Sequence, residues 1–321
     1  MRADSVAAAV AFCVCGTLAA CQVDVDAVRP TDVGADVGTG SDTADAVDTA
    51  PDATGDADDA ACDGLAARIE VLEGLEVVPQ TKLHLIGSLS CGDIARYQWE
   101  VAQPVGSRSV FLPSATAPDP TFEANVAGLY VFRLVVTGMD GEVSERAEAS
   151  VTVTPDHAVH VELVWDTPSD PNQTDEGPAA GADLDLHLLA PGGAWFDSDG
   201  VDCFWGGCVP PSWGGPVTDD RSLDRDDDDG AGPENINADV MPAGVYRVGV
   251  HTWDAHGFAP SYATVRVYLY GVLVFECEDM AIGERDFIEL GTLSWPDGAT
   301  AGRCGADVIH DFSPPPWFGA P

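Results

Sequence analysis

Alternation of apolar and polar residues constrains the fold of this chain more than any other feature. The leucines of Asp183–Leu188 alternate with acidic and histidine side chains, and Ala147–Val153 alternates small or branched apolar residues with polar ones. Such a period of two is typical of a half-buried β-strand, whereas an amphipathic helix repeats about every 3.6 residues. A helical period occurs only between Leu65 and Leu75, and it is weak there. The sequence therefore predicts an all-β protein with little helix.

Residues 62–155 predict a first β-sandwich domain. Tyr97, Trp99 and Val101 alternate with polar residues, which places Trp99 on a buried strand face, and Leu129–Thr137 is apolar enough for a central strand. Turn residues separate these runs, as in sandwiches built from short strands. A further strand face is expected from three leucines at even spacing, namely Leu83, Leu85 and Leu89.

Five short motifs follow one another within residues 62–155. They are Leu85-x-Gly-Ser88, Tyr97-x-Trp99, Pro120-Thr121-Phe122, Gly128-x-Tyr130-x-Phe132-x-Leu134 and Asp140-Gly141. Their order and spacing resemble a PKD-type immunoglobulin-like domain. The family's usual Trp-x-Phe-Gly-Asp-Gly stretch is absent, and Trp99-Glu-Val-Ala102 stands there instead. The resemblance implies an immunoglobulin-like sandwich without implying a particular binding role.

Residues 157–297 predict a second antiparallel β-sandwich, so the expected class is all-β with two sandwich domains. Its expected strands cover residues 159–165, 184–188, 246–250, 263–269, 272–275 and 288–295. Three motifs occur in order, namely Asp183-Leu-Asp185-Leu-His187, Leu223-Asp-Arg-Asp226 leading into Gly230-x-Gly232-Pro-Glu-Asn235, and Pro242-x-Gly244-x-Tyr246. They resemble the uncharacterised bacterial family DUF2135. This resemblance implies a fold and an extracytoplasmic setting, and no settled activity.

The first twenty residues have the features of an export signal. Arg2 supplies positive charge, and Val6–Ala20 is apolar but too short to span a bilayer, which takes about 20 apolar residues. Leu18-Ala-Ala-Cys21 resembles a bacterial lipobox, which implies that residues 1–20 are removed and that Cys21 is acylated. Gln22, rather than Asp, after that cysteine favours the outer membrane. The alternative is an ordinary secretory signal that contains a chance cysteine.

The segments at both ends of the two domains have linker-like compositions. Residues 21–61 contain an aspartate every few positions and no aromatic residue, so they predict a disordered acidic linker. Residues 298–321 are rich in Gly and Pro and are expected to form a loose tail, apart from Cys304. The whole chain has 54 acidic and 14 basic residues. This excess disfavours nucleic acid as a partner and leaves the acyl chains as the expected membrane contact.

Six cysteines remain after the N-terminal three are assigned to the signal and the anchor. An even number of cysteines in an exported chain predicts disulfides. The expected pairs are Cys62–Cys91, Cys203–Cys208 and Cys277–Cys304. A zinc site is the alternative, but the close pair Cys203 and Cys208 lacks a second pair at zinc-finger spacing.

Clustered carboxylates suggest a Ca²⁺ site in the second domain. Repulsion within the acidic run that begins at Asp219 would be relieved by a hard divalent cation, which takes six to eight oxygen ligands. The alternation in Asp183–His187 places two carboxylates and an imidazole on one strand face. The expected ligands are Asp183, Asp185, Asp224, Asp226 and Asp228. The alternative is a solvated strand face beside a soluble acidic loop.

Other side chains give weaker functional signals. His251 and His256 could form a metal site, although histidine at a strand end is more often a surface residue. Loop aromatics could contact a sugar or a protein, or could form a small core that covers the loops. These aromatics are Trp195, Phe196, Phe204, Trp205, Trp213, Trp253 and Phe258.

The sequence contains no Gly-x-Ser-x-Gly, His-Glu-x-x-His or phosphate-binding glycine motif. We therefore expect a non-catalytic binding or adhesion protein of the bacterial envelope, lipid-anchored, with a glycan or protein ligand and Ca²⁺ as a structural cofactor. An accessory or hydrolytic domain that acts on envelope polysaccharide or peptide is the alternative, and a stalk without a ligand is a third option.

Overall fold

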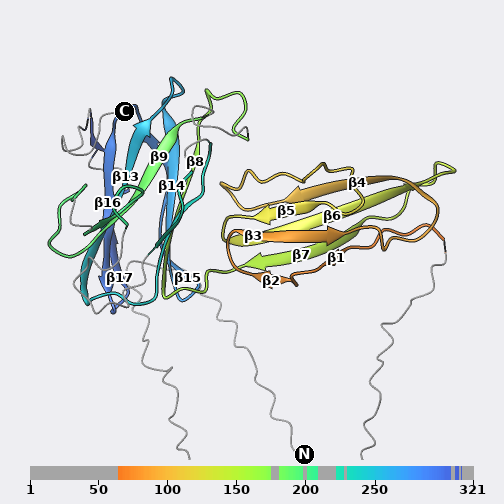
Figure 1. Cartoon of the computed structure of the whole chain (residues 1–321), viewed down its shortest axis with the longest axis horizontal. Coiled ribbons are helices and arrows are strands. Elements are labelled where there is room, and N and C mark those ends of the chain that lie inside the picture. Colours follow the sequence, from red (N-terminus) through yellow and green to blue (C-terminus); the bar gives the residue numbers. More distant parts are fainter. Residues whose placement is uncertain are drawn as a thin grey trace, which may run out of the picture. The chain divides into compact units, whose positions relative to one another are not determined.

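The expected all-β class is confirmed. The computed structural model describes residues 64–174, 181–197, 201–208, 222–227, 230–304, 308–310 and 312. Every regular element within these ranges is a strand (Figure 1). In the same ranges no helix has the length and apolar character needed to cross a membrane. The expected signal peptide and linker, with Cys21 and Cys62, lie outside the described residues.

Seven strands form the first domain. They are β1 (Glu70–Val71), β2 (Glu76–Val77), β3 (Thr81–Ile86), β4 (Ile94–Ala102), β5 (Thr121–Ala124), β6 (Gly128–Gly138) and β7 (Ala147–Val153). One sheet has the order β1-β3-β5 and the other has the order β2-β7-β6-β4. Residues from both sheets form one hydrophobic core, which is the arrangement of a β-sandwich.

The core of the first domain is rich in aromatic rings. Trp99 on β4 is 3% exposed, and its indole nitrogen donates a hydrogen bond to Ala117 O at 2.9 Å. Phe122 and Phe132 pack edge to face with centroids 5.2 Å apart. One expectation was wrong, because Leu89 is 50% exposed. Strand β3 ends at Ile86, so Leu89 does not continue the inward face.

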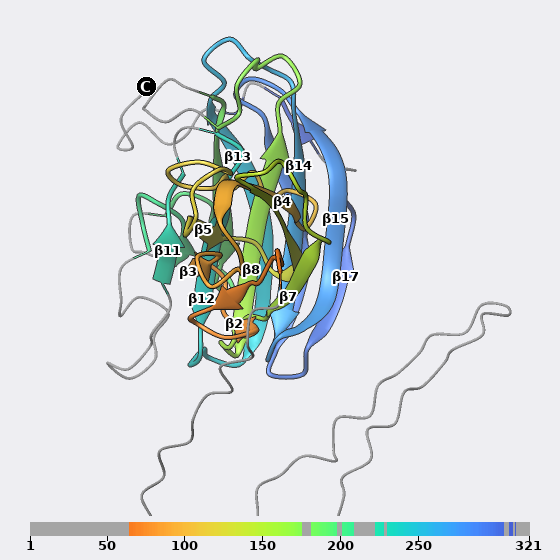
Figure 2. The same ribbon diagram turned by 90° about the vertical axis from the view of Figure 1, so that its right-hand side faces the viewer.

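Eleven strands form the second domain. They are β8 (Val159–Asp166), β9 (Asp183–Leu189), β10 (Asp202–Cys203), β11 (Ser222–Arg225), β12 (Glu234–Ala238), β13 (Gly244–Asp254), β14 (Ser261–Leu269), β15 (Val272–Ile282), β16 (Phe287–Trp295), β17 (Ala299–Gly302) and β18 (Val308–Ile309). One sheet has the order β10-β9-β13-β16-β17, with β18 also on β16, and the other has the order β11-β12-β8-β14-β15 (Figure 2).

The second core lies between these two antiparallel sheets. The alternation in β9 works as expected on one side, because Leu184, Leu186 and Leu188 are fully buried in that core. Trp165 on β8 lies in the same core and donates its indole N–H to Ala182 O at 3.0 Å. The sequence did not indicate β10, β11 or β12, since these strands are short and β12 is mostly polar.

Disulfides join the cysteines that the sequence paired, as far as the described residues show. The structure contains Cys203–Cys208 and Cys277–Cys304. Cys91 is disulfide-bonded as well, and its expected partner Cys62 lies outside the described residues. These bonds consume the thiols that the alternative zinc site would need.

The chain after residue 297 continues the second domain, so the expected loose tail from residue 298 was wrong in part. Strand β17 pairs with β16 from Ser294↔Ala299 to Gly291↔Gly302. Strand β18 pairs with the other end of β16. Cys304 lies between these two strands in the sequence and is disulfide-bonded to Cys277. Phe312 packs on the aromatic residues described below.

Candidate metal centre

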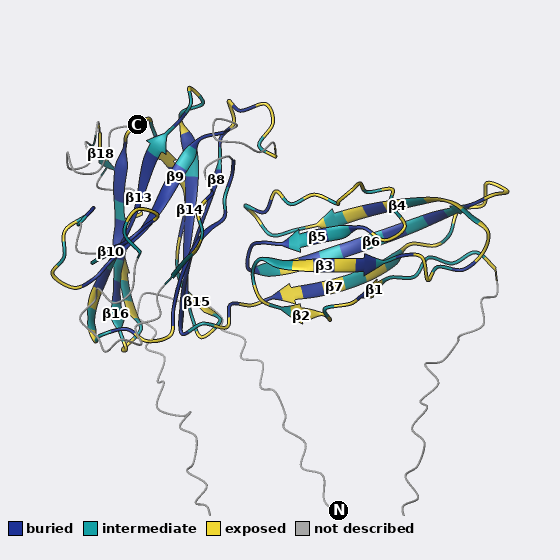
Figure 3. Ribbon diagram, in the orientation of Figure 1, coloured by how far each residue is buried: buried dark blue, intermediate teal, exposed yellow. Residues whose placement is uncertain are grey.

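Strand β9 is buried on both faces. Its leucine face belongs to the core between the sheets, and its other face carries Asp183, Asp185 and His187. Buried residues predominate along β9 as a whole (Figure 3). Asp185 is 1% exposed and His187 is fully buried, so the alternative of a solvated strand face is wrong for these two residues. Buried charged groups need hydrogen bonds, an opposite charge or a metal ion. The contacts of this face therefore indicate its chemistry.

A cluster of aromatic rings covers the polar face of β9. Its buried members are Phe196, Phe204 and Phe287, and Trp195 and Phe312 pack against them. His187 stacks on Phe204 with centroids 4.7 Å apart. The small-core interpretation of the loop aromatics is therefore confirmed for Phe196 and Phe204. Trp205 remains 43% exposed, and Trp213 lies outside the described residues.

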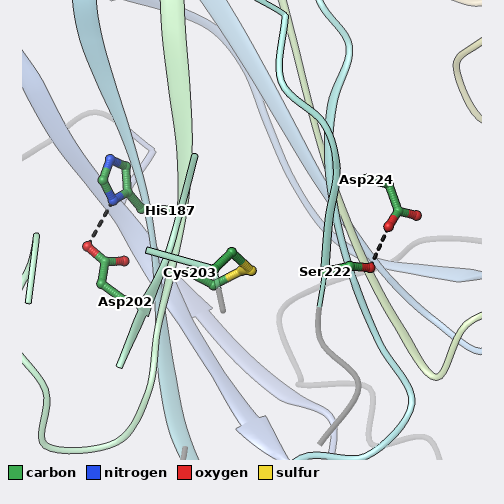
Figure 4. The surroundings of a disulfide bond; sticks show 6 residues. His187, Asp202, Cys203, Ser222 and Asp224 are labelled. Carbon is green, nitrogen blue, oxygen red and sulfur yellow. Dashed lines mark hydrogen bonds and ion pairs between the residues drawn. A yellow bond between two sulfur atoms is a disulfide. The ribbon is translucent and has the colours of Figure 1, made fainter. Parts of the chain in front are cut away.

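A carboxylate fixes the orientation of the His187 ring. Its Nδ1 lies 2.9 Å from Asp202 Oδ2, and both side chains are fully buried (Figure 4). The backbone N–H of Phe196 donates to the same Asp202 oxygen at 2.7 Å. Within the described residues His187 Nε2 and Asp202 Oδ1 have no hydrogen-bond partner. Buried polar atoms without partners are uncommon and call for an explanation.

The neighbouring strand contributes a second imidazole. His251 on β13 stands opposite Asp185 in the strand register, and its Nδ1 lies 3.2 Å from Asp185 Oδ2. His251 is 2% exposed. Burial, and then the charge of His187, lower the pKa of His251 to about 3. The His251 ring is therefore neutral at physiological pH.

Glu234 brings a carboxylate from the opposite sheet. It is the first residue of β12 and is fully buried. Its Oε2 accepts a hydrogen bond from Leu186 N on β9 at 2.7 Å, and its Oε1 accepts one from Asp227 N at 3.4 Å. This side chain therefore joins the two sheets at Leu186, which precedes the residues of β9 that pair with β10.

Two further carboxylates lie beside Glu234. Carboxylate oxygens of Asp185, Asp226 and Glu234 lie within 4.8 Å of one another. Burial raises the pKa of Asp185 to about 7, with the charge of His187 opposing this rise. Burial also raises the pKa of Glu234 well above its usual range, and the charge of Asp185 adds to that effect. Asp226 is exposed, whereas burial and proximity together make the ionised forms of Asp185 and Glu234 costly unless a cation is present.

The structure brings together only some of the expected Ca²⁺ ligands. Asp185 and Asp226 belong to the carboxylate group, and Asp183 is near enough to raise the pKa of Glu234. Asp224 belongs to neither group of possible ligands. It accepts a hydrogen bond from Ser222 (Figure 4) and another from Asn237. Asp228 lies outside the described residues.

His251 and His256 do not form the metal site that the sequence left as an option, and His251 is not the surface residue that was favoured instead. His256 Nδ1 contacts Gly181 O at 2.8 Å, and its side chain is 22% exposed. His251 instead converges with Asp185 and His187, whose possible ligand atoms lie within 4.8 Å of one another. Asp185 is thus shared by an all-oxygen group and by a group with two imidazoles.

Glu234 is the site residue that the sequence reasoning missed. It follows the acidic run and was not included among the expected ligands. Its place in the site depends on the pairing of β12 with β8, where Glu234 stands opposite Leu163. That pairing joins segments about seventy residues apart, and no local spacing signals it.

Comparisons with known proteins identify the type of the first domain. A family model for a PKD domain matches residues 74–154, which confirms the PKD-type resemblance. The solved D00-D0 domain of intimin is similar over 58% of this chain and 92% of its own, at 11% identity and a TM-score of 0.20. Likeness at that level carries no argument about function. No match to a curated protein was found.

Glu234 should give the metal-free protein a distinctive pH dependence. The folded state holds the Glu234 proton over a pH range in which the unfolded state has lost it, so stability falls as pH rises above about 4.3, by at most about 1.4 kcal/mol per pH unit. The pKa of Asp185 is raised and that of His251 is lowered, so near pH 5 the pair holds one proton in the folded state and one in the unfolded state. The contributions of these two residues to the pH dependence of stability therefore largely cancel. Thermal melting in chelator from pH 4.5 to 8 should show this slope, and Glu234→Gln should reduce it.

The matched control for this experiment is Glu278→Gln, which alters an exposed carboxylate on β15. We expect this variant to keep the wild-type slope. Equal slopes in the wild type and in Glu234→Gln would contradict the assignment.

Proposed function

We propose that this chain is a lipid-anchored, extracytoplasmic binding or adhesion protein of the bacterial envelope, and that it is not catalytic. The observation that carries the proposal is the PKD-type domain at residues 74–154, followed in the chain by a second all-β domain. Paired antiparallel sheets of this kind hold exposed loops on a rigid support, and such loops commonly carry binding surfaces.

Two observations support an extracytoplasmic location. The structure contains two disulfides in the second domain, and such bonds persist in oxidising compartments. The lipobox-like Leu18–Cys21 and the acidic residues 21–61 add an anchor and a spacer to the proposal. The resemblance of the second domain to DUF2135 agrees with the same setting. We place the anchor in the outer membrane because Gln22 follows Cys21.

The burial of the polar residues supports a non-catalytic role. A catalytic group has to reach its substrate, and Asp185, His187 and His251 are all buried, with exposures of 1%, 0% and 2%. Asp185 is the one observation that favours the hydrolytic alternative, because a carboxyl pKa of about 7 suits a general acid. Its position beneath the aromatic rings argues for a structural role instead.

A binding and turnover screen tests the proposed function. The full chain would be immobilised and exposed to envelope glycans, peptides and proteins. We expect saturable binding to one class without product release. Product formation that disappears in Asp185→Asn would support the hydrolytic alternative and contradict the proposal. Absence of any binding would favour the stalk without a ligand.

Loss of the anchor should release the protein from membranes. Cys21→Ala removes the expected acylation site, and each acyl CH₂ withdrawn from the bilayer costs about 0.8 kcal/mol of binding. The variant should appear in the soluble fraction when membranes are separated by centrifugation. Cys15→Ala, upstream of the expected cleavage, is the control and should remain membrane-bound. A Cys21→Ala protein that stays with membranes after a high-salt wash would disprove lipidation.

We further propose Ca²⁺ as a structural cofactor, held by Asp185, Asp226 and Glu234. These three carboxylates can supply up to six oxygens, within the number that Ca²⁺ accepts. Without an ion, buried Asp185 and Glu234 avoid mutual repulsion by retaining their protons. A bound cation removes that repulsion and allows both groups to ionise. The proposal retains two of the five ligands expected from the sequence and adds Glu234.

Calcium should therefore raise the melting temperature of the full chain. An ion at one hundred times its Kd stabilises by about 2.7 kcal/mol, and Ca²⁺ should restore chelator-treated protein better than Mg²⁺, which prefers a tighter octahedron. Asp226→Asn combined with Glu234→Gln should remove this dependence. Asp224→Asn is the matched control, since Asp224 bonds to Ser222 and Asn237, and it should respond like the wild type. Identical melting in chelator and in millimolar Ca²⁺ would refute the cofactor.

A further inference from the structure

We propose that His187, His251 and Asp185 form a structural Zn²⁺ site beneath the aromatic cluster of the second domain. This site differs from the Ca²⁺ site in its ligand atoms, since two of its three ligands are nitrogens. It does not depend on the proposed adhesion function.

The orphaned nitrogen of His187 is the first observation behind this site. A carboxylate oxygen accepts hydrogen bonds, so the 2.9 Å contact with Asp202 Oδ2 assigns the N–H of a neutral His187 ring to Nδ1. In that tautomer the lone pair lies on Nε2. This nitrogen is fully buried and has no partner among the described residues. A lone pair on neutral imidazole is what a metal ion requires.

The spacing of the possible ligand atoms is the second observation. One atom from each of Asp185, His187 and His251 lies within 4.8 Å of the others. Asp185 Oδ2 and His251 Nδ1 are 3.2 Å apart. Bonds of about 2.0–2.2 Å to tetrahedral zinc place neighbouring ligand atoms about 3.3–3.6 Å apart. Small side-chain movements are therefore enough to close the three groups around one ion.

The surroundings of the two imidazoles match those of structural metal sites. A ligating histidine usually donates its other ring N–H to a carboxylate, which fixes the tautomer and orients the ring. Asp202 does this for His187, and Phe196 N holds Asp202 in turn. Asp185 and His251 stand opposite each other on paired strands. The ligands therefore lie on rigid elements and not on loops.

Ligand chemistry separates the two proposed ions. Imidazole nitrogen suits zinc and related transition metals, whereas Ca²⁺ takes oxygen ligands. The rings of Phe196, Phe204 and Phe287 enclose the histidines and exclude bulk water, which suits an ion that holds structure. Asp185 belongs to both groups and has two oxygens, so one carboxylate can serve both ions.

Cobalt is the probe for this site, because Co²⁺ replaces Zn²⁺ and its visible absorption reports the number and type of ligands. The full chain with its disulfides intact should bind one Co²⁺, give a visible absorption spectrum without thiolate bands, and release the Co²⁺ on addition of one Zn²⁺. His187→Phe and His251→Phe should each abolish the spectrum. Asp202→Asn should weaken binding about 10–100-fold, the usual cost of losing an outer-shell partner.

Two control variants separate this site from its neighbours. His256→Gln alters a nearby imidazole outside the group and should bind Co²⁺ normally. Asp226→Asn combined with Glu234→Gln should also retain the spectrum while losing any response to Ca²⁺. If Ca²⁺ has no effect but Co²⁺ binds, the calcium proposal fails and the zinc proposal stands.

Four results would overturn the zinc site. They are a wild-type chain that gives no Co²⁺ absorption, thiolate bands in its spectrum, unchanged binding in both histidine variants, and loss of binding in the Asp226 and Glu234 double variant. Near-ultraviolet circular dichroism would show whether the histidine variants fold. If they do not, the wild-type titration and Asp202→Asn decide the question.

Discussion

The hydrogen bond from Leu186 N to Glu234 links the two sheets of the second domain at a point on β9 just outside its pairing with β10. A backbone N–H beyond the end of a strand pairing needs another acceptor, and burial makes that need stronger. A glutamate from the opposite sheet supplies it, at the cost of placing a carboxyl group in the interior. The neighbouring Asp185 adds to that cost, because its negative charge makes the ionisation of Glu234 less favourable.

Acidity has different consequences inside and outside this molecule. Most of the 54 acidic residues can remain ionised in water, where their repulsion is weak and keeps the protein soluble. Asp185, Asp202 and Glu234 are almost completely buried, and there each negative charge must meet a proton, a hydrogen-bond donor or a cation. The imidazoles beside Asp185 lie in the same dry space. Several buried ionisable groups of the domain therefore lie at or beside one face of β9. Each proposed metal ion would lower the free-energy cost of their negative charge.

Local patterns in the sequence predicted the local parts of the structure. Period-two alternation located β4, β7, β9 and β14, because side chains on a strand alternate whatever surrounds them. The spacing of the PKD-type motifs identified the first domain. Cysteine pairing was predictable for Cys203–Cys208, whose members are five residues apart.

Features that depend on distant segments were not predictable. Alternation places Asp185 and His187 on one face, but it cannot tell whether that face meets water or the ring of Phe287, one hundred residues later. The role of Glu234 depends on a strand pairing with β8, and the bond of Asp224 to Asn237 depends on the same sheet. The closing strands β17 and β18 lie in a segment whose glycines suggested a tail. In each case tertiary contacts override the local composition.

Phe312 also bears on the order in which the second domain can form. This ring packs against Phe196 and Phe287 with centroids 5.3 and 5.2 Å apart. It follows every proposed metal ligand in the chain and is therefore synthesised after them, as are the strands β17 and β18 that pair with β16. Until they emerge, the polar face of β9 lacks part of its cover and the histidines remain open to water. In a chain that folds after export, a metal ion of the envelope can therefore reach its proposed ligands before the later segment packs over them and encloses it.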